Sequence, residues 1–316
     1  MKIFCNGFNL YKKFNSSDPL IKTFKDFNIE GISDLEVSLT FAILKSENNE
    51  IYLTGGNSNE TQNVKFDFGL ITSLSCTNDN IFVLNNLGQI FQIDIVNLDN
   101  VVEIPTQEFL KKDDKFMLLA IGDKMKVGLT KFGYIYDIPR KVNFDVHSSL
   151  DIRVGGVHCL ILDSQGNVYT FGSGSRGQLG FGTLEDQCDP KQIEALAGIP
   201  IVAIDCGTWH CAAISKDGDL YTWGWNQNGQ LGLPMHNMSN VDGVSVMACP
   251  HVIDFPDPNA RVVKVACGKR HTIALLDTGE LYGCGMNKYK QLKDEDCDII
   301  EMMTFYTIFL QKMCGI

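Results

Sequence analysis

The stretch that decides the fold runs from Cys206 to Leu233 and reads CGTWHCAAISKDGDLYTWGWNQNGQLGL. Its apolar run at 211–214 follows a histidine, His210, and a turn centred on Gly218 separates this run from a second one rich in aromatic side chains. Glycine in such a turn supplies the positive φ that other residues resist. The stretch therefore predicts an antiparallel pair of strands followed by a polar, glycine-rich turn.

Two more copies of this unit align with it without gaps, one on each side in the sequence. All three share a glycine three residues before the histidine, the histidine, a turn glycine eight residues after it, a tyrosine at eleven, a glycine at fourteen and Gln-Leu at twenty. In chain order the histidines are His158, His210 and His271, the glycines before them are Gly155, Gly207 and Gly268, and the glycines at plus fourteen are Gly172, Gly224 and Gly285. The run after each histidine is continuously apolar, which predicts a strand buried on both faces. A lone unit cannot bury two faces, so the repeat predicts sheets stacked against one another, with these histidines and glycines as structural residues.

Eroded copies extend the repeat toward both ends of the chain. The anchor positions that correspond to the histidine fall at 41, 80, 125, 158, 210 and 271. A seventh anchor falls in the apolar stretch 302–310, and residues 4–9 resemble the second strand that this last unit lacks. We therefore predict seven units in a ring that the N-terminal strand closes by pairing with the last unit. The expected layout is one domain over 1–316, with its best-formed repeats at 150–292, residues 1–30 completing the last unit and a loop insertion at 233–260.

Composition narrows the class of protein. The 27 basic and 38 acidic side chains among 316 residues give a net charge of −11, which argues against binding nucleic acid through a basic face. No apolar run approaches the roughly 20 residues that a membrane span requires, and Asn6 and Gly7 interrupt any apolar core of a signal peptide. Eleven cysteines without a Cys-x-x-Cys pair fit a reducing compartment. We expect a nuclear or cytosolic protein that binds neither nucleic acid nor membrane.

Three features could carry chemistry, and each has a simpler structural explanation. Residues 172–177 match the G-x-G-x-x-G fingerprint of dinucleotide sites, but the neighbouring copy has glycines in the same register and no helical pattern follows. The three histidines could form a zinc site, but each recurs once per unit, which favours a neutral imidazole bonded to nearby backbone. No serine or cysteine stands in a nucleophile motif. We expect no metal, no cofactor and no enzymatic activity.

The units resemble the regulator of chromosome condensation repeat in Gly-x-x-His, the Asp-Gly turn and the run YTWGWNQNGQLG at 221–232. The resemblance covers 150–292, and the third copy departs from it with Lys290 and Lys293 in place of glycines. It implies an all-β fold, a seven-bladed β-propeller. The chain is most similar to the small single-propeller members, which implies a nuclear scaffold that targets or stabilises a JmjC-domain oxygenase, a histone demethylase, on chromatin. The alternative that the family implies is nucleotide exchange on a small GTPase of the Ran type.

The resemblance also indicates where a partner would bind. In this family the two positions between the glycine and the histidine reach the rim, which selects Trp209, Lys269 and Arg270, while Trp225 and Arg176 stand in the glycine-rich turns. Tryptophan and arginine are enriched at binding hot spots. We expect these five residues to form the partner-binding surface of a monomeric propeller within a heteromeric complex. Two alternatives stay open: Trp209 packs into a sheet edge, or the methionine-containing insertion 233–260 binds instead.

Overall fold

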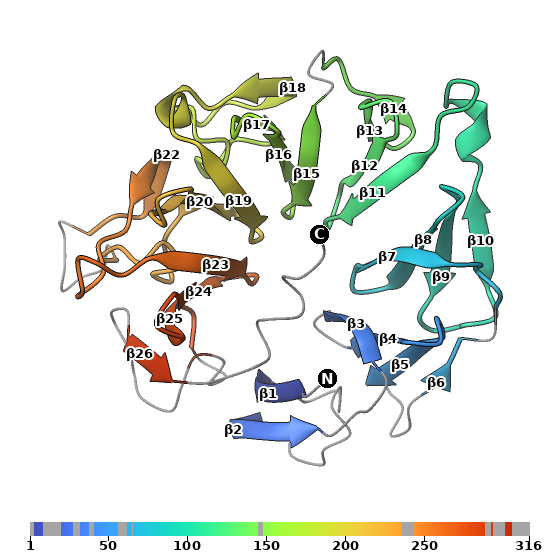
Figure 1. Cartoon of the computed structure of the whole chain (residues 1–316), viewed down its shortest axis with the longest axis horizontal. Helices are drawn as coiled ribbons and strands as arrows, with labels where there is room; N and C mark the ends of the chain where they lie inside the picture. The colour runs from blue at the N-terminus through green and yellow to red at the C-terminus, as the bar shows by residue number, and fades with distance from the viewer. Residues whose placement is uncertain are drawn as a thin grey trace.

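The computed structural model describes residues 3–8, 20–27, 32–37, 41–55, 62–64, 66–144, 148–235, 243–287, 292 and 301–304. Its strands form seven antiparallel sheets, six with four strands and one with two. The helices of the described residues are two short 3-10 turns, η1 (Thr106–Glu108) and η2 (Glu194–Leu196), and none is long and apolar enough to cross a membrane. The predicted all-β class is confirmed. Figure 1 shows the sheets side by side around a ring, the arrangement of a β-propeller.

Each four-stranded sheet consists of four strands that follow one another in the chain. The three sheets with clear repeats are the His158 sheet, made of β15 (Ser149–Val154), β16 (His158–Asp163), β17 (Val168–Gly172) and β18 (Gln187–Gln192); the His210 sheet, made of β19 (Ile201–Cys206), β20 (His210–Ser215), β21 (Leu220–Trp225) and β22 (Val246–Val252); and the His271 sheet, made of β23 (Val262–Cys267), β24 (His271–Leu276), β25 (Glu280–Gly285) and β26 (Glu301–Thr304). The other three are β3 (Ile32–Val37), β4 (Phe41–Ser46), β5 (Ile51–Gly55) and β6 (Gln62–Asn63); β7 (Ile71–Cys76), β8 (Asn80–Asn85), β9 (Ile90–Asp94) and β10 (Val101–Ile104); and β11 (Phe116–Ile121), β12 (Lys126–Thr130), β13 (Ile135–Asp137) and β14 (Arg140–Lys141). The two-stranded sheet pairs β1 (Ile3–Phe8) with β2 (Leu20–Phe27).

The second and third strands of each repeat sheet are the hairpin that the sequence predicts. Each histidine opens its second strand opposite the glycine fourteen residues later, as in His210 and Gly224. Gly224 has a φ of 106°, and a Cβ there would lie 2.5 Å from the carbonyl oxygen of Trp209. Both facts require glycine, which explains this column of the repeat. β20 is buried along its whole length, as the continuous apolar run predicts.

The glycines before His158 and His210 are required by close packing between neighbouring sheets. A Cβ on Gly207 would lie 2.1 Å from Cε1 of His210 and 2.5 Å from the carbonyl oxygen of Gly268 in the His271 sheet. A Cβ on Gly155 would meet the ring of its own histidine and the carbonyl oxygen of Gly207 in the same way, at 2.2 and 2.5 Å. The turns of the His158, His210 and His271 sheets therefore lie directly against one another in succession, without room for a side chain between them.

Apolar side chains fill the space between neighbouring sheets. Trp223 of the His210 sheet is fully buried in one cluster with Leu160 and Ile193 of the neighbouring repeat, and its Nε1 donates a hydrogen bond to the carbonyl oxygen of Gln178 at 2.9 Å. Comparable clusters join each of the other neighbouring four-stranded sheets from β3 to β25. The faces that a single sheet would expose to water are thus buried by its neighbours.

The ends of the chain differ in part from the prediction. Residues 302–304, expected to belong to the seventh unit, lie in β26, which pairs with β25 as the fourth strand of the His271 sheet. Without β26, β25 would be the edge strand of this sheet and would carry unpaired N–H and C=O groups, and β26 pairs with these groups. β1 pairs with β2, and Figure 1 places this pair between β26 and β3. Residues 305–316 lie outside the described residues, so the count of seven units and closure by the N-terminal strand stay predictions.

The segment 233–260, expected to be an irregular insertion, contains a regular strand. β22 forms the fourth strand of the His210 sheet and corresponds in place to β18 of the His158 sheet. This strand is hard to predict from the sequence because it lies at a sheet edge. Its side chains are exposed or half-buried, so they lack the alternation of apolar and polar residues that indicates a strand. Residues 236–242 lie outside the described residues.

The packing of the turns predicts different costs for two Gly→Ala substitutions. Gly207→Ala should lower the free energy of unfolding by about 2–3 kcal/mol, because its Cβ would overlap the buried His210 ring and the backbone of the next sheet. The control is Gly198→Ala, where a Cβ would meet nothing within 4 Å and only the φ of 83° is unfavourable, at about 1 kcal/mol. Urea unfolding of both variants measures the difference, and equal losses would show that the turns do not pack as described.

Candidate functional site

The turns between the first and second strands of four sheets gather on one face of the ring. Successive turns are joined by backbone hydrogen bonds: the N–H of Lys124 donates to the carbonyl oxygen of Gly156, and the N–H of Gly156 donates to that of Thr208, both at 3.1 Å. Lys269, from the His271 sheet, reaches across to Asp123, with its Nζ 4.0 Å from Oδ1. The positions between glycine and histidine therefore form one continuous surface.

Four of the five residues predicted to bind a partner meet on this surface. The guanidinium carbon of Arg176 lies 5.1 Å from the ring centroid of Trp225 and 5.9 Å from that of Trp209. The guanidinium carbon of Arg270 lies 5.5 Å from the same ring of Trp225. These four residues are called the Trp-Arg cluster below. It combines side chains from all three repeat sheets. Members that belong to different sheets are 33 to 94 positions apart in the sequence, and the stacking of the repeats brings them together.

The members of the Trp-Arg cluster differ in exposure. Arg176 and Arg270 are exposed, Trp209 is half-buried, and Trp225 is only 9% exposed. Trp225 is therefore a buried base on which the two guanidinium groups rest through cation–π contacts. Within the described part of the chain, neither arginine has a carboxylate at ion-pair distance. The fifth predicted residue, Lys269, lies outside the cluster and forms its exposed ion pair with Asp123 instead.

Two glutamines, Gln178 and Gln230, hold the turns that carry this surface. The Oε1 of Gln178 accepts a hydrogen bond from the backbone N–H of Arg176 at 2.8 Å, and Gln230 does the same for Asn228 at 2.9 Å. Both glutamines are fully buried. Their carbonyl oxygens accept hydrogen bonds from the next sheet, including that of the Trp223 indole to Gln178. The repeat showed these glutamines as a shared column, but this role was not predicted.

Two of the repeat histidines, His158 and His210, join neighbouring sheets through side chains. Nε2 of His210 lies 2.9 Å from Oγ1 of Thr272, which donates its own proton to the carbonyl oxygen of Gln230 at 2.7 Å. The hydroxyl can then only accept from His210, which fixes the neutral tautomer with its proton on Nε2. Nε2 of His158 contacts Cys211 of the next sheet in the same way, at 2.9 Å. The sequence predicted backbone partners for these rings; the partners are side chains of the next sheet, a contact that only the ring arrangement creates.

Burial sets the protonation of the groups in this layer. It lowers the pKa of His210 to about 3 and that of His271 to about 4, so both rings are neutral at physiological pH. It raises the pKa of Cys284 to about 12. Cys206 differs: burial raises its pKa, but hydrogen bonds with Cys211 and His158 and the electrostatic interaction with His158 outweigh this and lower it to about 7. The three repeat histidines open strands of three different sheets and form no common site.

Comparison with known proteins identifies the repeat. The model of the regulator of chromosome condensation (RCC1) repeat matches residues 165–214 and 217–275, and a second model of this repeat matches 151–178, 201–230 and 262–291. RCC1 domain-containing protein 1 of Homo sapiens is 35% identical over 191 residues, which cover 51% of this chain and 50% of that protein. The chain thus spans about half the length of the curated relatives it first matches.

Two solved structures share the fold over nearly the whole chain. Prp20p from Saccharomyces cerevisiae has a TM-score of 0.79 at 16% identity, and the match covers 97% of this chain and 86% of that one. Human WBSCR16 has a TM-score of 0.75 at 16% identity and covers 96% and 95%. At this identity the two structures establish the fold.

The low pKa of His271 predicts that acid destabilises the protein. The pKa of this ring is about 4 in the folded chain and about 6.5 when unfolded. Between these values the unfolded chain takes up a proton that the folded chain does not, so the free energy of unfolding should fall as the pH is lowered from 6.5 to 4. At pH 5 this ring alone should account for a loss of about 1–2 kcal/mol relative to pH 7.5.

Urea unfolding at pH 7.5 and 5.0, of the natural chain and of His271→Gln, measures this contribution. The variant should lose less stability between the two pH values than the natural chain, whatever its stability at pH 7.5. The same pH dependence in both proteins would show that the folded chain does not hold His271 as a neutral ring.

Proposed function

We propose that this β-propeller, whose residues 151–291 carry RCC1 repeats, is a non-enzymatic scaffold that binds a protein partner through the Trp-Arg cluster. The observation that carries the proposal is the pair of exposed guanidinium groups resting on one buried indole, that of Trp225. Tryptophan and arginine are the side chains that most often dominate binding energy at interfaces. Here they occupy adjacent turns of three sheets on one face.

The geometry favours tight binding because the cluster is held in place before a partner arrives. The cation–π contacts and the hydrogen bond from the backbone N–H of Arg176 to Gln178 restrict this side chain and its turn. Ordering a free arginine costs about 0.5–1.5 kcal/mol on binding, and prior ordering reduces that cost. The packed sheets beneath the turns leave the surface little freedom to rearrange.

Charge indicates the chemistry of the partner. Arg176 and Arg270 place two positive charges on one patch of a chain whose net charge is −11. A guanidinium group offers paired N–H donors that match a carboxylate. The partner segment that fits the Trp-Arg cluster is therefore acidic, and its affinity should fall as the salt concentration rises.

The identity of the partner rests on the family resemblance of the sequence. It points to a JmjC-domain oxygenase on chromatin, which the chain would target or stabilise as a monomeric propeller in a nuclear heteromeric complex. The alternative is nucleotide exchange on a small GTPase of the Ran type. Prp20p is described with binding properties to Gsp1p and histones, but at 16% identity its likeness carries the fold and not the partner. Release of labelled GDP from the GTPase, accelerated by this chain, would favour the alternative.

The Trp-Arg cluster predicts which substitutions abolish binding. The double variant Trp209→Ala/Arg270→Ala should abolish capture of the oxygenase from nuclear extract, measured by affinity purification and mass spectrometry, while the melting temperature changes little. Arg140→Ala is the matched control, because Arg140 is an exposed arginine beside Asp137 and Asp189, away from the cluster. Unchanged capture by the double variant would move the interface to the segment 233–260 or to the opposite face.

A further inference from the structure

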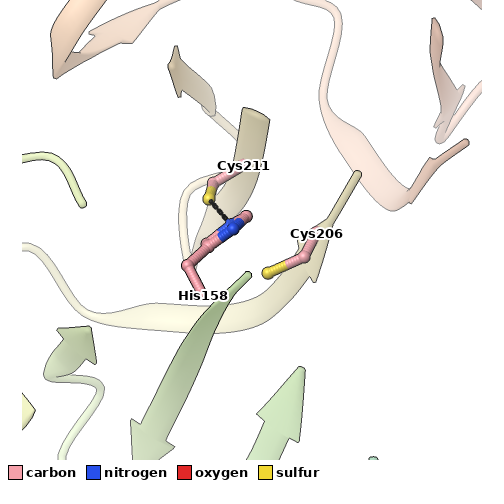
Figure 2. Close-up of side chains that lie close together, drawn as sticks. All are labelled: His158, Cys206 and Cys211. Atoms are coloured by element: carbon pink, nitrogen blue, oxygen red, sulfur yellow. Dashed lines mark hydrogen bonds between the residues drawn. The ribbon is translucent and has the colours of Figure 1, made fainter. Parts of the chain in front are cut away.

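Two thiols and an imidazole converge between the His158 and His210 sheets. The side chains are those of His158, Cys206 and Cys211, and one ligand atom from each lies within 4.8 Å of the other two. Nε2 of His158 is 2.9 Å from Sγ of Cys211. Figure 2 shows the two sulfur atoms directed toward the imidazole, from the end of β19 and the start of β20. Among the described residues, this is the one group of three such ligands.

Strand register brings the two thiols together. Cys206 and Cys211 are directly opposite in the pairing of β19 with β20, so their side chains leave the same face of the hairpin. That face meets His158, because the histidine of one sheet contacts the residue after the histidine of the next. The convergence therefore follows from the fold and not from a flexible loop.

The next interface has the same geometry but lacks one thiol. There His210 contacts Thr272, and Cys267 lies opposite Thr272 in the pairing of β23 with β24. Cys267 thus corresponds to Cys206, and the threonine hydroxyl stands where Cys211 has its sulfur. At this interface a threonine hydroxyl makes the contact with the histidine. A histidine contact between sheets therefore does not require a cysteine at the position of Cys211. Within the described part of the chain, the set of one histidine and two cysteines occurs only at the interface between the His158 and His210 sheets.

We propose that His158, Cys206 and Cys211 bind one zinc ion. Two thiolates and an imidazole are ligands that zinc prefers in proteins. A tetrahedral ion with Zn–S bonds of about 2.3 Å and a Zn–N bond of about 2.0 Å holds its ligand atoms roughly 3.5–3.8 Å apart. The three atoms here, all within 4.8 Å of one another, reach that arrangement by small side-chain adjustments. Cys206 is half-buried, and the three residues leave one position of a tetrahedral ion for a water molecule.

Binding balances charge and connects two sheets. Each thiol loses its proton to solvent when the ion binds, so two thiolates neutralise the two positive charges of zinc. The ion would then link β16 to both strands that flank the turn carrying Trp209. Zinc would raise the stability of the folded chain by mass action, because the unfolded chain holds no such preformed set.

The test is a zinc titration of the reduced, metal-free chain in a Cys188→Ser/Cys249→Ser background, which removes the two exposed described cysteines. We expect one zinc per chain, measured by competition with a chromogenic chelator, and a rise in melting temperature on loading. Cobalt(II) in place of zinc should give the absorption of a tetrahedral thiolate complex. The absence of bound zinc, or zinc bound without a change in melting temperature, would overturn the proposal.

Two substitutions separate this site from adventitious binding. Cys211→Thr gives the interface the residue that the next interface already has, so the metal-free chain should melt as before while zinc binds at least a hundredfold more weakly. Thr272→Cys completes a second set with His210 and Cys267 and should raise the stoichiometry from one zinc to two. Undiminished zinc binding by Cys211→Thr would overturn the proposal, because the ion would then be held elsewhere.

Discussion

The fold depends on the close approach of each Gly-x-x-His turn to the turn of the next sheet. At Gly207 the backbone of one sheet, the imidazole of His210 and the carbonyl oxygen of Gly268 leave no space for a Cβ. A sheet of this kind buries both faces only when its neighbours lie at that distance, so local and global requirements coincide. The close approach of the sheets also buries polar groups. Buried glutamine and histidine residues form hydrogen bonds with these groups across the interface, as His210 does with Thr272 and Gln178 with Trp223.

The same turns supply both the rigidity and the surface. In the turn of the His210 sheet the glycine and histidine pack against the neighbouring sheet, and Thr208 and Trp209 between them are half-buried. Lys269 and Arg270 at these two positions of the His271 sheet are exposed, whereas Gly156 of the His158 sheet is buried against Thr208. The repeat keeps the packed glycine and histidine, whereas the position directly before the histidine varies, with Val157, Trp209 and Arg270 at corresponding sites of the three sheets. The cysteine pair is a further variation of this kind. Corresponding positions carry Cys211 at one interface and Thr272 at the next, and the cysteine adds a ligand atom while the strand pairing stays the same.

Much of this architecture could be predicted from the sequence. The hairpins, their turn glycines and the proximity of tryptophan and arginine side chains all follow from three aligned copies. The first strand of each sheet was missed because a bulge near its start, between Ile201 and Ala203 in β19, breaks the alternation that marks a strand. Its buried residues Ile201 and Ile204 are three positions apart. The contact of Lys269 with Asp123 could not be predicted because the partner lies in an eroded copy three sheets away. Cys206 and Cys211 stand at different positions of the repeat, and only the strand register shows that they lie opposite each other.

Hydrogen exchange of the turn amides tests most directly whether the turns form one rigid layer. The N–H of Gly207 donates to the carbonyl oxygen of His210 at 2.9 Å, and that of Gly156 donates to Thr208 at 3.1 Å. If the layer holds the ring together, both amides should exchange only when the whole chain unfolds, with the same opening free energy as the buried strand β20. Exchange of these amides through local opening, at a much lower free energy than β20, would contradict the account, because the turns would then open without the ring.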